Sequence, residues 1–331
     1  RVTKKNKGKD QSGTYDIYAY EFLPLEYKKT VFFTCLMHGT ETATSIAMYE
    51  LMKHIVNNDT DSPVLKYMRQ NVRIILVPVV NPWGLNNGQY GNVNGVNSAR
   101  NFPYYWSEYI SSGSVWDMKG SAPFSEKETV IIRDIAISLC GELDFIIDYH
   151  TGEGSSWQTE PFFYYDNTNS NIVPALFRAG NIIRSDYFTE KGTVPTSETI
   201  ETSRTLNIFW FNRCLQDPMA TIEFSPALYS STANNSTQLT ALMWNYLRYW
   251  TELFSLPKYV NNSTLGIERL TESEYNAIPA KSYKKIYSLI DKLGVNKLGD
   301  IDYILPLNIS ISQADYNSLA VKDPNTIYYV Y

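Results

Sequence analysis

The sequence predicts an α/β protein in which a mixed, mostly parallel twisted sheet carries helices on both faces. Two observations lead to this fold class. Apolar segments of strand length alternate with longer segments of helical period, which is typical of parallel sheets covered on both sides. After residue 257 the alternation stops and a short motif occurs twice, so a small C-terminal repeat module is expected in addition.

Four apolar runs have the length and the β-branched or aromatic content of buried strands. They occupy residues 31–37, 72–80, 144–150 and 219–225. Strands that are apolar along their whole length are typical of a sheet that is buried on both faces. We therefore expect these four runs to form the centre of the sheet.

Three segments have the spacing of helices. The segment after the first run repeats apolar residues at helical intervals, namely Ala43, Ile46, Ala47, Leu51 and Ile55. A second helix is expected from Ser125 to about Leu139, because Ser125 and Glu128 have the spacing of a capping box. A third helix is expected over residues 238–254.

The chain divides into three regions. Residues 1–13 hold five basic side chains among the first nine positions and are predicted to be a flexible basic end, with a binding arm as the alternative. Residues 14–258 form the α/β domain. Residues 264–331 form the repeat module, because the segment 270–278 recurs as 311–319 at an ungapped offset of 41. Each copy is expected to be a short helix that leads into an apolar strand.

Composition and charge exclude several classes of protein. The chain has 331 residues, of which 44% are hydrophobic, and a formal net charge of −5. This is a globular composition, and its acidic balance gives no general case for nucleic acid or membrane as a partner. The longest apolar run, 72–80, is too short to cross a bilayer. The three cysteines form no CxxC pair, so neither a disulfide framework nor a zinc ribbon is indicated.

Two of the three histidines are placed as metal ligands. His38 and Glu41 lie three residues apart where a strand leads into a helix, so one turn can present both side chains to one ion. His150 ends the run 144–150, at the sheet edge where open α/β folds place their ligand sites. Two histidines and one glutamate that leave a fourth position to water are typical of catalytic zinc.

The remaining histidine and a nearby carboxylate have simpler interpretations. His54 lies in the last turn of the first expected helix, where the helix dipole explains it better than a metal does. Asp148 lies two residues before His150 on the same strand face. It is suited to hydrogen-bond a ligand histidine or to cap a neighbouring segment.

Six short motifs in order carry a resemblance to a known family. Together they resemble the zinc metallocarboxypeptidases of the funnelin type, which have the carboxypeptidase A-like fold, over about residues 15 to 258. The motifs are HGTE at 38–41, VPVVNPWG at 77–84, ARNFP at 99–103, GSAPFSEKET at 120–129, DYH at 148–150 and ATIEFS at 220–225.

The resemblance implies that residues 14–258 are a catalytic domain that hydrolyses a peptide bond near a free carboxylate. Glu223 would be the general base that activates a zinc-bound water. Arg100, with Asn101 beside it, would bind the substrate carboxylate, a surface ion pair being the alternative for Arg100. One zinc ion per chain would be held by His38, Glu41 and His150.

Three departures from the family pattern concern substrate recognition. Ala99 stands where the family usually has Asn, and no second Arg or Lys lies between Asn81 and Arg100. A tyrosine expected about twenty residues before the base is also missing from 198–209. The expected pocket therefore offers fewer donors than that of an ordinary carboxypeptidase.

The end of the chain suggests where the enzyme works. Residues 322–331 look similar to segments of phage tail and baseplate proteins from Gram-positive hosts. This resemblance implies an extracellular or virion-associated enzyme acting on peptidoglycan stem peptides and attached to a larger assembly through 264–331. Two alternatives are a zinc amidohydrolase of the desuccinylase/deacylase type and a phage tail structural protein with a vestigial site.

Overall fold

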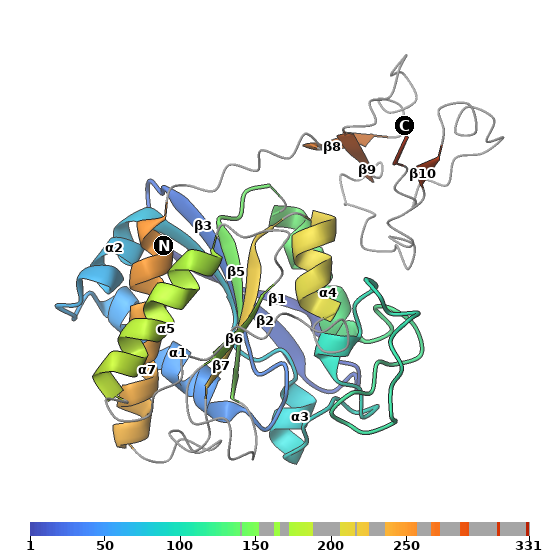
Figure 1. Ribbon diagram of the computed structural model, residues 1–331, viewed down its shortest axis with the longest axis horizontal. Coiled ribbons are helices and arrows are strands. Elements are labelled where there is room, and N and C mark those ends of the chain that lie inside the picture. Colours follow the sequence, from blue (N-terminus) through green and yellow to red (C-terminus); the bar gives the residue numbers. More distant parts are fainter. Residues whose placement is uncertain are drawn as a thin grey trace.

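The computed structural model describes most of the α/β domain and short parts of the C-terminal region (Figure 1). The described residues are 1–139, 141–151, 162–165, 172–187, 206–215, 217–224, 236–256, 266–271, 285–290, 310–311 and 329–330.

Seven strands form one sheet in the order β1-β2-β4-β3-β5-β7-β6. Strands β4, β3, β5 and β7 are mutually parallel, whereas β1, β2 and β6 pair antiparallel with their neighbours. The expected mixed, mostly parallel sheet is thus confirmed, and the four apolar runs are its four parallel strands. The bounds are β1 Val2–Lys9, β2 Asp16–Phe22, β3 Lys29–Cys35, β4 Val72–Val77, β5 Phe145–Thr151, β6 Phe162–Tyr165 and β7 Met219–Phe224.

Helices cover both faces of this sheet (Figure 1). Successive strand residues enter different cores: Phe33 packs with residues of α1, α2, α5 and α7, whereas Phe32 packs with residues of α4 and of the segment after α6. The helices are α1 Thr42–Asn57, α2 Pro63–Asn71, α3 Pro82–Asn87, α4 Lys127–Leu139, α5 Val173–Tyr187, α6 Leu206–Phe209 and α7 Ser236–Ser255, with a 3₁₀ turn at Ser98–Arg100 and a π turn at Trp210–Leu215.

The packing of α7 fixes the strand that carries His150. Trp250 on α7 stacks on Phe33 with ring centroids 5.6 Å apart, and its indole Nε1 donates to the Tyr149 hydroxyl at 2.7 Å. All three side chains are fully buried. A buried Trp whose N–H has a partner packs without an unsatisfied donor, so β5 is held firmly one residue before His150.

The N-terminal end differs from the prediction. The prediction that residues 1–13 are flexible rests on their having almost no apolar side chains, but Val2–Lys9 forms β1 and pairs with β2 from Val2↔Phe22 to Lys9↔Asp16. Backbone hydrogen bonds hold an edge strand without an apolar face. Its lysines find local partners, since Lys5 pairs with Glu21 at 3.1 Å and Lys9 with Asp16 at 2.9 Å.

The expected capping box at the start of α4 is also absent. Glu128 does not turn back to Ser125; its carboxylate accepts from the Gln11 backbone N–H at 3.0 Å and from the Asn92 amide at 3.2 Å. The helix itself is present from Lys127 to Leu139. Glu128 instead ties the N-terminal hairpin to the body of the domain.

The C-terminal region contains two short pairs of parallel strands, and the same offset of 41 residues that separates the two sequence repeats separates these pairs. β8 (Gly266–Thr271) pairs with β9 (Lys285–Ile290), and β10 (Ser310–Ile311) pairs with β11 (Tyr329–Val330). The register Leu270↔Leu289 in the first pair corresponds to Ile311↔Val330 in the second, which is the same offset of 41. The expected short helices and the linker lie outside the described residues.

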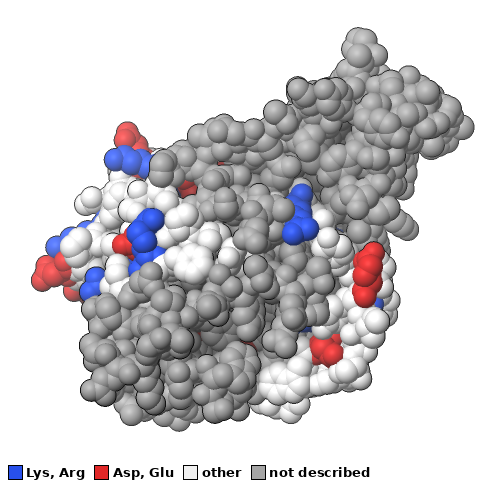
Figure 2. All heavy atoms as spheres, in the orientation of Figure 1, with Lys and Arg blue, Asp and Glu red and all other residues white. Residues whose placement is uncertain are grey.

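In Figure 2 basic and acidic side chains both appear on the part of the visible face that is described. None of the helices in the described part of the chain has the length and apolar character that crossing a membrane requires.

Candidate metal centre and active site

The turn that carries His38 and Glu41 depends on a close backbone approach. A Cβ on Gly39 would lie 2.2 Å from the backbone of Gly84, so only glycine fits between the two ligands. Glu41 occupies the N-cap position of α1, but its side chain makes no capping hydrogen bond. Its carboxylate is therefore available to the histidines.

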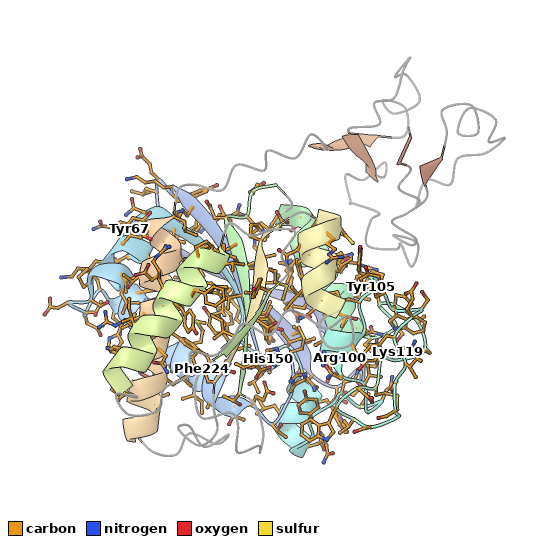
Figure 3. All side chains as sticks on the ribbon, viewed as in Figure 1. Tyr67, Arg100, Tyr105, Lys119, His150 and Phe224 are labelled. Carbon is orange, nitrogen blue, oxygen red and sulfur yellow. The ribbon has the colours of Figure 1, made fainter. Side chains whose placement is uncertain are left out.

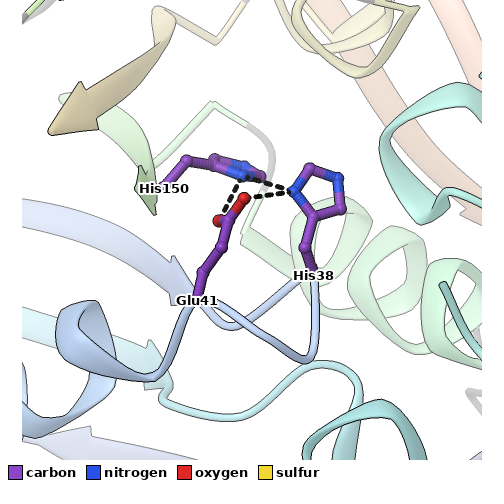
Figure 4. A group of neighbouring side chains, drawn as sticks. All are labelled: His38, Glu41 and His150. Atoms are coloured by element: carbon purple, nitrogen blue, oxygen red, sulfur yellow. Dashed lines mark hydrogen bonds and ion pairs between the residues drawn. The ribbon is translucent and has the colours of Figure 1, made fainter. Parts of the chain in front are cut away.

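Three side chains converge at the carboxyl edge of the parallel strands (Figure 4). The Glu41 carboxylate lies 2.8 Å from His38 Nδ1 through Oε1 and 2.9 Å from His150 Nδ1 through Oε2. The two Nδ1 atoms are 3.0 Å apart. All three residues are buried. The structure thus brings together the residues expected to be metal ligands.

The outer nitrogen of each ring faces an oxygen. His38 Nε2 lies 3.0 Å from Asn97 Oδ1, and His150 Nε2 lies 2.7 Å from Asp148 Oδ2. Because both oxygens are acceptors, each Nε2 carries the hydrogen of its neutral ring. Each Nδ1 then has a free lone pair that points toward the Glu41 carboxylate. Two nitrogen lone pairs and one carboxylate that face the same point can bind a cation there. The donor set and its supporting hydrogen bonds are those of a zinc site.

The surroundings shift the pKa values of the three ligands in different directions. Burial lowers the pKa of His38 and outweighs the opposite effect of Glu41, which favours the neutral ring. Burial would raise the pKa of Glu41, but the two imidazoles lower it to about 2, so the carboxylate stays ionised. At His150 burial is outweighed by Asp148 and Glu41, which raise its pKa well above the usual value. This excess of negative charge around His150 also favours a bound cation.

Glu223 lies beside the metal ligands because of the sheet register. In the parallel pair β5·β7, His150 is paired with Glu223. Its buried Oε2 has no hydrogen-bond partner among the described residues. Burial raises the pKa of Glu223 to about 8, against the opposing charge of His150. A carboxylate with these properties is suited to proton transfer near neutral pH.

Arg100 reaches the same region from a 3₁₀ turn. The Asn97 side chain caps this turn by accepting from the Ala99 N–H at 2.9 Å. The Arg100 Nε is buried and has no partner among the described residues. The positive charge of Arg100 lowers the pKa of the Glu223 carboxyl group, although burial outweighs it. Figure 3 labels Arg100 and His150 in the lower half of the domain. Its expected role in carboxylate binding stays a prediction.

The expected role of Asn101 in substrate binding is wrong. Its side chain is fully buried and its hydrogen-bonding capacity is filled within the protein. Nδ2 donates to Lys119, Ala122 and Ser125, and Oδ1 accepts from the Glu126 N–H and the Thr129 hydroxyl. Asn101 holds the start of α4 against the turn that carries Arg100.

Two other sequence interpretations have clear outcomes. His54 lies in the last turn of α1, as the helix-dipole interpretation assumed, and it pairs with Asp59 at 2.7 Å and does not belong to the metal-ligand group. Asp148 bonds a ligand histidine, as one of its two interpretations proposed. Sequence reasoning missed Asn97. Its place just before a short turn that leads to Arg100 is typical of a capping Asn and could have drawn attention to it.

The fold and these side chains define a mononuclear metal centre of the two-histidine, one-carboxylate class on a mostly parallel α/β sheet. The sequence model of a family described as zinc carboxypeptidase matches residues 14–208. The chain therefore belongs to the zinc carboxypeptidase family, a family of zinc metallopeptidases. Glu223 lies beyond the matched segment.

Solved structures that include carboxypeptidases have a similar fold. A metallo-carboxypeptidase from Burkholderia cenocepacia is 16% identical, with a TM-score of 0.54 over 77% of this chain and 65% of its own. Carboxypeptidase A from Helicoverpa armigera is 19% identical, with a TM-score of 0.55 over 76% of this chain and 68% of its own. Bovine thrombin-activatable fibrinolysis inhibitor is 14% identical, with a TM-score of 0.58 over 77% and 89%.

The chain spans less than two thirds of the Burkholderia protein that it matches. At its other end, a family model described as phage tail tip domain matches residues 310–331. This short match covers the second copy of the internal repeat.

Proposed function

We propose that this chain is a zinc-dependent peptidase that hydrolyses a peptide bond near a free carboxylate of its substrate. The observation that supports this most directly is the buried Glu223 Oε2, which has no hydrogen-bond partner among the described residues and belongs to the residue paired with His150. An unpaired buried carboxylate is unfavourable unless it has a function or a bound partner.

Each residue of the site has its own role in the proposed hydrolysis. Zinc held by His38, Glu41 and His150 would supply a Lewis acid that polarises the scissile carbonyl and lowers the pKa of water. Glu223 accepts the proton of the attacking water and returns a proton to the nitrogen of the leaving amine. Asp148 keeps the His150 ring in the tautomer that directs Nδ1 inward.

Arg100 binds the substrate carboxylate. Its guanidinium group is fixed on a capped turn and can donate two parallel hydrogen bonds to a carboxylate. The neighbouring Ala99 contributes no donor. A substrate that binds well must therefore supply further contacts of its own.

We infer that peptidoglycan stem peptides are the substrate class. They have additional carboxylates and D-centres, which provide groups for binding that plain dipeptides lack. The match of residues 310–331 to a phage tail tip domain supports an extracellular or virion location, where such stems are accessible. Residues 264–331 would attach the enzyme to a larger assembly.

The family match favours a peptidase over the desuccinylase/deacylase alternative. Against a vestigial site stand three intact ligands with both outer hydrogen bonds in place. A vestigial tail protein would show no turnover on any peptide even when loaded with zinc.

A digest of purified Gram-positive muropeptides, followed by mass spectrometry, tests the proposal. We expect cleavage within the stem peptide. Arg100→Ala should raise KM roughly tenfold or more with less effect on kcat, because each hydrogen bond to a charged group contributes about 1.5–3 kcal/mol. Arg178→Ala is a suitable control, since Arg178 pairs with Glu252 on the surface. Efficient release of aromatic or aliphatic residues from plain L-peptides, with no action on muropeptides, would contradict the substrate assignment.

A further inference from the structure

Three aromatic rings form a row that leads from the metal centre to the surface. The His38 ring is buried, and Tyr90 stacks on it with ring centroids 3.8 Å apart and ring planes 20° apart. Tyr90 is half-buried. Trp116 packs on Tyr90 in turn, with centroids 4.3 Å apart, and is 48% exposed. The exposed indole is therefore two ring contacts away from a metal ligand.

The backbone around Trp116 is fixed to the body of the domain. The Trp116 carbonyl accepts from the Asn97 amide Nδ2 at 2.6 Å, and the Met118 carbonyl accepts from the Asn97 backbone N–H at 2.9 Å. Next to Trp116, the Val115 side chain packs so closely on Gly91 that a Cβ added there would lie 3.0 Å from it. A ring on a backbone held at these points loses little freedom when a ligand packs on it.

One lysine closes the loop that carries Trp116. The Lys119 ammonium donates to the carbonyls of Trp106 and Tyr109, both at 2.7 Å, and lies 4.1 Å from the centroid of the Trp106 ring. The Trp106 indole Nε1 donates back to the Lys119 carbonyl at 3.2 Å. Residues 106–119 thus form a closed loop that presents Trp116 in a set position on a rigid scaffold.

Trp116 differs from the tryptophans that stabilise the fold. Trp210 and Trp250 are fully buried, whereas Trp116 stays about half exposed although ordered contacts hold its backbone beside the metal centre. An indole is a large, rigid apolar surface with a polar N–H at one edge, and it adds contact area at a low cost in conformational entropy. These features are typical of a side chain that binds a ligand.

The chemistry of the proposed substrate indicates what packs on this ring. Stem peptides of peptidoglycan have short or charged side chains and no aromatic residues. The stem is joined to an amino sugar, whose ring has a face of C–H groups with hydroxyl and amide groups around its edge. The sugar ring is thus the one flat apolar group of a muropeptide, and it matches the exposed indole in shape and polarity.

We propose that Trp116 binds the sugar of a muropeptide by packing on the apolar face of the sugar ring. This inference rests on the proposed function, in which the metal centre and Arg100 bind the stem peptide. Lys119 is a positioning residue, because it holds the loop and need not touch the sugar. The enzyme therefore distinguishes a stem that carries its sugar from a free stem of the same sequence.

Equilibrium binding to the zinc-loaded Glu223→Gln protein tests the inference without turnover. The two ligands are a disaccharide muropeptide and the free stem peptide of identical sequence. The muropeptide should bind roughly 3–10-fold more tightly, which is the usual contribution of one packed aromatic ring. Adding Trp116→Ala should remove this difference and leave the Kd of the free stem unchanged, whereas Trp116→Phe should keep part of the difference because a flat ring remains.

Two further variants test the presentation of the ring and serve as a control. Lys119→Met removes both bonds to the loop carbonyls, so the backbone amides of 106–118 should exchange hydrogen faster and the muropeptide should bind less tightly, with zinc content unchanged. Tyr49→Ala is the matched control, because Tyr49 is a 61% exposed aromatic residue on α1. Its replacement should change neither the two Kd values nor the exchange of 106–118.

Three outcomes would overturn the inference. Equal weakening of both ligands by Trp116→Ala would mean that the ring contacts the peptide and not the sugar. Equal binding of the two ligands before that substitution, or a difference that survives it, would mean that the sugar does not pack on Trp116. Failure of the proposed function looks different and overturns both ideas, because then neither ligand binds and the muropeptide digest shows no cleavage.

Discussion

The two sides of the metal centre are built from different parts of the fold. His150 and Glu223 lie on the paired strands β5 and β7, within the buried sheet. His38 lies in the turn after β3 and Arg100 in the 3₁₀ turn Ser98–Arg100, and Asn97 Oδ1 accepts hydrogen bonds from His38 Nε2 and from the Ala99 N–H. On the strand side the backbone register sets the geometry, whereas on the turn side single polar contacts set it.

The two ligand histidines also differ in the charge of the residue that bonds their outer nitrogen, Nε2. Asp148, the partner of His150, is fully buried and its other oxygen accepts from the Thr34 hydroxyl on β3 at 2.6 Å. The partner of His38 is a neutral amide. A buried carboxylate needs several donors, and Asp148 has them in Thr34 on β3, His150 on its own strand and Asn207 on α6. The strand side thus supplies one ligand with a charged partner and Glu223, whereas the turn side supplies the other two ligands and Arg100.

The largest expected effect is removal of the strand-side ligand. His150→Ala should reduce bound zinc from one per chain to well below one after reconstitution, and activity should be lost with it, because only two ligands remain. Metal analysis of chelator-treated, zinc-reconstituted protein measures this. His54→Ala should keep full zinc. If His150→Ala bound a full equivalent, the assigned site would be incorrect.

The next effect concerns the base on the neighbouring strand. Glu223→Gln should keep the fold and the zinc but lower kcat on the order of 10²–10⁴-fold, because the amide cannot carry the proton. Glu252→Gln, on the surface of α7, should have no effect. A rate near that of the unchanged protein, with zinc bound, would remove Glu223 from the mechanism.

Asp148→Asn would make the strand side resemble the turn side, since His150 would then also bond an amide. Zinc affinity should fall about 10–100-fold, because the carboxylate that increases the basicity of His150 is lost. Chelator competition measures the change. Asp217→Asn, a buried carboxylate at the opposite end of β7, is the control. An unchanged affinity would mean that the charge difference between the two sides has no consequence for the metal.

The smallest expected effect is that of the C-terminal module. A chain that ends at Pro257 should bind zinc and turn over small substrates as the full chain does, since the assigned zinc ligands and Glu223 all lie before that point. It retains the Leu256 carbonyl, which accepts from the buried Lys29 ammonium at 2.7 Å. Loss of zinc or of thermal stability in this chain would show that the module contributes to the core.

The sequence predicted the strand side of the site well. Mostly apolar runs of strand length predict the four parallel strands, and the histidine at the end of one of them lies at the carboxyl edge as expected. The spacing of His38 and Glu41 was also sufficient, because one turn brings both side chains together. In these cases a local pattern determines the geometry.

The parts that escaped prediction depend on contacts between distant segments. The role of Asn97 requires that residues 38 and 116 approach it, which no local pattern encodes. The predicted role of Asn101 in substrate binding rested on its position next to Arg100. Its side chain instead makes hydrogen bonds to five residues from elsewhere in the chain. β1 was overlooked because its strand depends on pairing with β2 and not on apolar side chains.

The lysine-rich strand β1 has a consequence for how the protein behaves in solution. It is the outermost strand of the seven, and its exposed side chains are mostly charged or polar. Edge strands with lysines resist pairing with other chains, whereas β2 alternates buried apolar residues such as Ile17, Ala19 and Phe22. Without β1, the unpaired edge of β2 would be open to strand addition by a second molecule. The basic N-terminal strand thereby protects the catalytic domain against aggregation.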